Sequence, residues 1–79
     1  MDHIRDIVAA IAKVLVDNPD DVTVTVTEAE EFTVLELRVL QTDLGKIIGK
    51  GGRMASSIRR IVMAAGMTQK RLVKLQIME

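Results

Sequence analysis

The feature that most constrains this chain is the tetrapeptide Gly49-Lys50-Gly51-Gly52, which separates two segments with helical character. Before it, residues 44–48 predict a short helix that Asp43 can cap. After it, apolar residues recur at helical spacing over residues 54–65, and Gly66 predicts the end of that helix. Glycine tolerates positive φ and leaves its backbone accessible. A tight turn between two helices is therefore predicted, with room for the backbone of a ligand.

The other elements follow from apolar periodicity. Residues 2–16 predict an amphipathic helix, which ends at Asp17-Asn18-Pro19 because proline cannot continue a helix. Residues 22–27 alternate valine with threonine, which predicts a half-buried strand, and a polar turn joins it to a second strand over residues 33–39. A last strand over residues 73–77 follows the long helix after a loop.

The order of these elements predicts the fold class. A chain of 79 residues is too short to divide its core, so residues 1–79 are expected to form a single domain. The second and third strands are joined by a helical crossover, and such a connection normally makes a parallel pair. We therefore expect an α+β fold of order α-β-β-α-α-β, in which three helices pack on one face of a three-stranded mixed sheet.

The composition excludes several classes of function. There are no cysteines and only one histidine, His3, so thiol catalysis, cysteine-based metal sites and histidine-based triads are not expected. The acids that follow Asp17 do not form a calcium loop, because Pro19 and Val22 stand where a ligand and a glycine are required. We expect no metal, no cofactor and no catalysis. The lone aromatic residue, Phe32, disfavours folds that stack bases on aromatic side chains.

Hydropathy and charge bear on location and on partners. No apolar run is long enough to span a membrane, and the N-terminus lacks the layout of a secretory signal, so a cytoplasmic protein is expected. The net charge of zero conceals a segregation: residues 1–43 contain ten acidic and three basic residues, and residues 44–79 contain eight basic and one acidic. A polyanion-binding end would explain this split. Attraction between two solvated faces within the fold would explain it as well.

The glycine turn lies where an anion is favoured. The helix that follows it presents unpaired N–H groups and the positive end of its dipole. Lys46, Lys50 and Arg53 add positive charge around the same point. The apolar residues that could form a floor for bases are Ile47, Ile48, Ala55 and Ile58. A phosphate clamp beside an apolar groove is one way to hold single-stranded nucleic acid.

At these residues the chain resembles a known family. The pattern Ile-Gly-x-x-Gly between two helices is similar to the signature of the KH domain, whose GXXG loop clamps the backbone of four nucleotides. Here that loop is Gly49 to Gly52. The additional helix and strand precede the core, as in the type II, prokaryotic arrangement. The resemblance extends to small bacterial proteins that consist of one KH domain, and it covers nearly the whole chain.

The resemblance implies RNA as the ligand and suggests roles for individual residues. Lys50 would be the charged member of the phosphate clamp, and Arg53 would lie beside the backbone of the bound strand. Lys70 and Arg71 would lie in or beside the variable loop of a type II domain. The candidate RNA-binding residues are Lys46, Ile47, Ile48, Gly49, Lys50, Gly51, Gly52, Arg53, Ile58, Lys70 and Arg71.

The chain departs from the family pattern at two positions. Many KH signatures place a large aliphatic residue where Ala55 stands, so the floor is expected to rest on Met54 and Ile58 instead. The second variable position of the loop is Gly51, which leaves the loop with one charge and greater freedom.

The resemblance also implies partners and a biological role. It implies an RNA chaperone or post-transcriptional regulator that forms a homodimer and pairs with a larger KH-containing protein of the KhpB/Jag type, linked to cell elongation. The alternative is a protein-interaction subunit, which dimerises or joins a larger RNA-binding or cell-elongation complex and has little RNA affinity of its own.

Two further motifs fit less well. A DNA-binding helix-turn-helix also joins two helices by a turn, but residues 44–48 are too short for its first helix. A P-loop is excluded because three residues, rather than four, separate Gly45 from Gly49, and no serine or threonine follows Lys50.

Overall fold

A computed structural model describes residues 2–78 and contains three helices and three strands. In chain order these are α1 (Asp2–Leu15), β1 (Thr23–Glu28), β2 (Phe32–Arg38), α2 (Leu44–Ile48), α3 (Arg53–Thr68) and β3 (Leu72–Met78). Short 3-10 turns over residues 19–21, 41–43 and 50–52 lie between them. Among the described residues, no helix combines the length and apolar character needed to cross a membrane.

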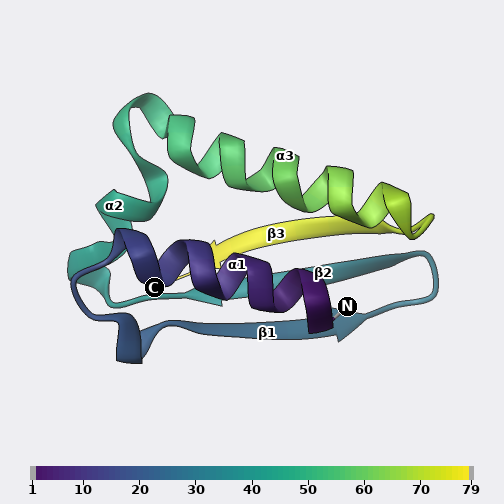
Figure 1. Ribbon diagram of the computed structural model, residues 1–79, viewed down its shortest axis with the longest axis horizontal. Coiled ribbons are helices and arrows are strands. Elements are labelled where there is room, and N and C mark those ends of the chain that lie inside the picture. Colours follow the sequence, from purple (N-terminus) through teal and green to yellow (C-terminus); the bar gives the residue numbers. More distant parts are fainter. Residues whose placement is uncertain (1, 79) are drawn as a thin grey trace.

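The sheet is mixed, with β2 in the centre. β1 pairs with β2 in antiparallel orientation, and β2 pairs with β3 in parallel orientation. Leu35 of β2 lies opposite Val26 on one side and Leu75 on the other, so one apolar row crosses all three strands. The helices lie on one face of this sheet (Figure 1). The predicted α+β architecture of order α-β-β-α-α-β is confirmed.

One hydrophobic core fills the space between the sheet and the helices. β2 contributes Leu35 and Leu37, both fully buried. Val8 of α1 and Val62 of α3 close over them, because the apolar positions of both helices recur at helical spacing. On β1 the threonines Thr23, Thr25 and Thr27 are exposed on the other face, as the period of two predicts.

The end of α3 differs from the sequence prediction. Gly66 does not stop the helix, which continues to Thr68. A Cβ atom at Gly66 would lie 2.6 Å from Val73 Cγ2 and 2.7 Å from the carbonyl oxygen of Arg71. Gly66 is therefore required where α3 lies directly on β3. The chain turns two residues after the helix, at Lys70, whose φ is +56°.

Candidate nucleic-acid interface

The glycine turn joins α2 to α3 with a backbone that other residues rarely adopt. Gly49, Gly51 and Gly52 have φ values of 74°, 61° and 75°. At Gly49 the space is also closed, because a Cβ atom would lie 2.7 Å from Cβ of Met54. At Gly51 and Gly52 a Cβ atom would meet nothing within 4 Å, so the loop backbone is open on that side. The turn is held by the Gly49 N–H, which donates to the carbonyl of Gly45 at 2.9 Å.

A hollow of about 340 Å³ lies beside this turn. Its walls come from α2, the glycine turn and the start of α3, which are consecutive in the chain, and from the distant end of β3. The residues around it are Leu44, Ile48, Gly51, Gly52, Ala55, Ser56, Arg59 and Ile77. The aliphatic members form the floor, while the glycine backbone, Ser56 and Arg59 supply polar groups at the rim. We call this hollow the groove.

The structure separates the predicted apolar residues into two groups. Ile48 lines the groove. Ile47 and Ile58 do not line it, because both are fully buried in the core. The sequence predicts that the floor rests on Met54 and Ile58, but in the structure neither residue lines the groove. Ala55 lines the groove itself, and the small side chain leaves the hollow deeper than a large aliphatic residue would.

Sequence reasoning missed two residues of the floor. Leu44 falls within the predicted short helix and Ile77 within the predicted last strand, and the sequence places neither of them in the site. Ile77 is half-buried because it stands near the end of β3, where the sheet opens onto the groove. The parallel pairing of β3 with β2 was the available signal, since it brings Ile77 opposite Leu37, at the end of β2 that leads into α2.

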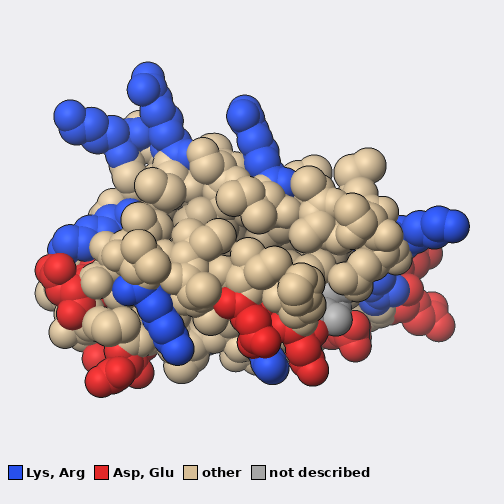
Figure 2. Space-filling model, viewed as in Figure 1, with Lys and Arg blue, Asp and Glu red and all other residues tan. Residues whose placement is uncertain are grey.

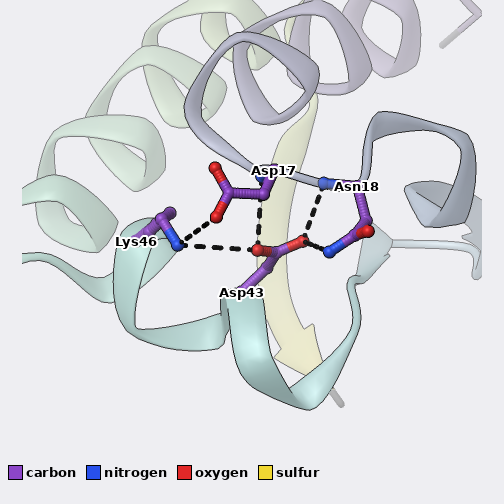
Figure 3. Close-up of polar contacts among 4 residues, drawn as sticks. All are labelled: Asp17, Asn18, Asp43 and Lys46. Carbon is purple, nitrogen blue, oxygen red and sulfur yellow. Dashed lines mark hydrogen bonds and ion pairs between the residues drawn. The ribbon is translucent and has the colours of Figure 1, made fainter.

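Asp43 anchors α2 in a way that its predicted role as a helix cap did not suggest. Its side chain makes no capping hydrogen bond to α2, and its carboxylate turns instead toward the residues that follow α1 (Figure 3). One oxygen accepts from the backbone N–H of Asp17 at 3.2 Å. The other accepts from the backbone N–H and side-chain amide of Asn18, at 3.1 and 3.0 Å. The end of α1 and the start of α2 are thereby fixed together.

Charge and hydrogen bonding set the ionisation of this cluster. Burial by itself would raise the pKa of Asp43, but the hydrogen bonds from Asn18 and Asp17 and the nearby Lys46 ammonium outweigh it and lower that pKa. Lys46 lies 2.9 Å from a carboxylate oxygen of Asp17 and 3.7 Å from one of Asp43. The hydrogen bond and charge of Asp17, followed by the charge of Asp43, raise the pKa of Lys46. Lys46 is thus an ion-paired residue at the back of α2.

Lys70 and Arg71 lie far from the glycine turn. They follow α3, whose 16 residues correspond to about 24 Å, and Figure 1 shows this end of the helix opposite the glycine turn. The guanidinium of Arg71 donates to the carbonyls of Ala29, Glu30 and Phe32, and its Nε–H donates to the hydroxyl of Thr33 at 2.9 Å. Arg71 therefore braces the turn between β1 and β2, which sequence reasoning did not anticipate.

Among residues 2–78, most basic residues around the glycine turn and along α3 form no ion pair with the acids of the first half, and Lys46 is the exception. Figure 2 shows several Lys and Arg side chains projecting beyond α3 and Asp and Glu gathered toward β1, with other Lys and Arg side chains lying beside these acids. Arg5 pairs with Asp2 and Asp6, and Lys46 of the second half pairs with Asp17 and Asp43 of the first. Lys50, Arg53, Arg59 and Arg60 are exposed around the turn and along α3. Attraction between the two halves is therefore seen at Lys46, while the exposed bases around the turn fit a polyanion-binding end.

Comparison with known proteins adds to this geometry. Residues 5–77 match the family model described as KhpA/KhpB, KH domain. The RNA-binding protein KhpA of Aquifex aeolicus is 48% identical over 79 residues, which is 100% of both chains. The RNA-binding protein KhpA of Bacillus subtilis is 40% identical over 77 residues, covering 98% of this chain and 95% of that protein. The resemblance found in the sequence is thus confirmed.

A solved structure shows the same fold at greater distance. A variant of Era from Aquifex aeolicus superposes with a TM-score of 0.62 at 22% identity, over 94% of this chain and 29% of the Era chain. The shared part therefore corresponds to one portion of a longer protein. With a family model matched over nearly its whole length, and with relatives of the same size, the chain belongs to the KhpA/KhpB family of KH domains.

Proposed function

We propose that this protein binds single-stranded RNA across its glycine turn and groove. The observation that carries the proposal is the juxtaposition of an open glycine backbone with a floor of aliphatic side chains. The relatives named RNA-binding protein KhpA support the same ligand. The binding uses positioning and charge, and no bond is made or broken.

The two halves of the site would hold different parts of the RNA. A phosphate of the strand would lie against the exposed loop backbone, near the Lys50 ammonium. Bases would lie over Ile48, Ala55 and Ile77, which bury apolar surface without reading a particular sequence. Ile47 and Ile58 would support this surface from within the core.

A site of this size would bind few nucleotides, and its affinity would fall with salt. Avidity from a homodimer, or from a larger partner of the KhpB/Jag type, would raise the affinity for longer RNA. In this proposal the protein acts in the cytoplasm as an RNA chaperone or post-transcriptional regulator.

The second candidate is a protein-interaction subunit with little RNA affinity. Exposed apolar side chains favour it: Val14 is 83% exposed, Met67 73% and Met63 50%. Isolated apolar residues are normal on a protein surface, so this observation weighs less than the groove.

Fluorescence anisotropy with a short labelled single-stranded RNA tests the proposal. The wild type is compared with the double variant Lys50→Asp/Gly51→Asp at two salt concentrations, after circular dichroism has shown that both are folded. Binding that weakens with salt and is lost in the variant is the expected result. Equal binding by both would place the site elsewhere on the basic surface. Binding by neither would favour the protein-interaction subunit.

A further inference from the structure

A second hollow, of about 360 Å³, adjoins the groove on the outer side of α3. It shares the loop residue Gly51 and the helix residue Ser56 with the groove. Its other walls are Arg53, Ser57 and Arg60. We call these three residues the outer face of α3. Unlike the groove, this hollow has no aliphatic floor.

Helical geometry explains the polarity of the outer face. Positions 53, 57 and 60 fall on one side of the helix, because they are separated by four and then three residues. The core-facing residues of α3, Ala55, Ile58 and Val62, lie on the other side. The two arginines are separated by about 10 Å along the helix axis. Both are exposed, and neither forms an ion pair with an acid among residues 2–78.

Two unpaired guanidinium groups in a polar hollow are suited to phosphate. Arginine presents a planar set of donors that matches two phosphate oxygens at once, and its charge does not depend on pH in the physiological range. The Ser57 hydroxyl, between the arginines, can donate a further hydrogen bond. None of the residues that line the hollow is aliphatic or aromatic, so it offers no side chain on which a base could stack.

We propose that an RNA strand longer than the groove continues past Gly51 onto the outer face of α3, where Arg53 and Arg60 bind its phosphates. This inference rests on the proposed function of the groove. A strand whose phosphate lies on the loop is already at the shared wall of the two hollows. The outer face would therefore lengthen the binding site and raise affinity without adding sequence preference.

The test compares two RNAs with and without these arginines. The double variant Arg53→Gln/Arg60→Gln is titrated with a four-nucleotide and a ten-nucleotide single-stranded RNA over a range of salt concentrations. Loss of two phosphate contacts should reduce the slope of log affinity against log salt by about 1.4 for the longer RNA. The single variant Arg60→Gln, which keeps Arg53 beside the loop, should leave the slope and affinity unchanged for the four-nucleotide RNA that fits in the groove. Lys13 is exposed on α1, and Lys13→Glu changes the net charge by the same amount as the double variant, so it serves as the control.

Each of the other results overturns the inference. Equal losses on both RNAs in Arg60→Gln would mean that Arg60 acts within the groove. Equal losses in the Lys13→Glu control would mean that net charge, and not position, is responsible. Unchanged binding of the long RNA would mean that the outer hollow receives something else, such as an acidic protein segment. Failure of the proposed function is distinct, since the wild type would then not bind the four-nucleotide RNA.

Discussion

The carboxylate of Asp43 accepts two hydrogen bonds from Asn18, a residue 25 positions earlier in the chain. With the N–H of Asp17 as a third donor, a single buried side chain joins the end of α1 to the start of α2. The glycine turn follows α2 directly, so this contact also helps to fix the position of the turn.

Asp43→Ala should therefore lower the thermal unfolding midpoint, because it leaves the partly buried N–H groups of Asp17 and Asn18 without their acceptor. Asn18→Ala removes only the side-chain donor and should have a smaller effect. Asp20→Ala, an exposed acid close in sequence, is the matched control. Thermal unfolding followed by circular dichroism measures all three. Equal midpoints for Asp43→Ala and Asp20→Ala would show that the buried contact contributes nothing.

The contribution of Asp43 should depend on pH. Its pKa is lower in the folded state than the ordinary value of 3.8, so the ionised form stabilises the fold. This stabilisation is fully present above pH 3.8 and is lost as the pH falls through the lowered pKa of the folded state. The difference in unfolding midpoint between wild type and Asp43→Ala, measured from pH 6 downward, should therefore shrink in acid. A difference that is constant with pH would contradict this assignment.

Two glycines of the turn should respond differently to alanine. Gly51→Ala places a side chain at positive φ in open space and should destabilise the fold by about 1 kcal/mol. Gly49→Ala adds a 2.7 Å approach to Met54 and should cost more than about 2 kcal/mol. Urea unfolding of both variants measures the difference. The order of the two effects is the decisive result, and a larger loss at Gly51 would refute this account of the turn.

Gly66→Ala should lower stability even though alanine is the better helix former. Helix propensity alone would raise stability by about 1 kcal/mol. The new Cβ atom would, however, lie 2.7 Å from the backbone carbonyl of Arg71, just before β3, and overpacking of this kind typically costs about 1–3 kcal/mol. Ala64→Gly, exposed on the same helix, provides the propensity term alone. A stabilising Gly66→Ala would mean that α3 can move away from β3 at little cost.

The sequence predictions were right where a feature depends on neighbouring residues and wrong where it depends on contacts between residues distant in the chain. Periodicity of two and of 3.6 identified every strand and helix, and the crossover identified the parallel pair of β2 and β3. The predicted end of α3 was wrong because the sequence does not distinguish a glycine that stops a helix from a glycine that permits close packing. Only the position of Val73, seven residues later, distinguishes them.

The site was predicted less completely for the same reason. The glycine turn is a local feature, and its conformation followed from four residues. The burial of Ile58 is consistent with the helical spacing of α3, but the arrival of Ile77 at the floor depends on the pairing of β3 with β2 and cannot be derived from local spacing. The contacts of Arg71 could not be predicted from local sequence either, since its hydrogen-bond partners lie about forty residues earlier, in and beside the β1–β2 turn.

The groove draws Leu44 from α2 and Ile77 from β3, and β3 itself is held by strand pairing between residues forty positions apart, such as Phe32 and Leu72. No fragment of the chain that lacks β3 can therefore present a complete groove. Binding of a ligand in the groove is therefore thermodynamically linked to folding. A ligand that fills the groove would shift the equilibrium from unfolded chains to the native state. Each tenfold increase in its concentration above its dissociation constant would add about 1.4 kcal/mol to the free energy of unfolding.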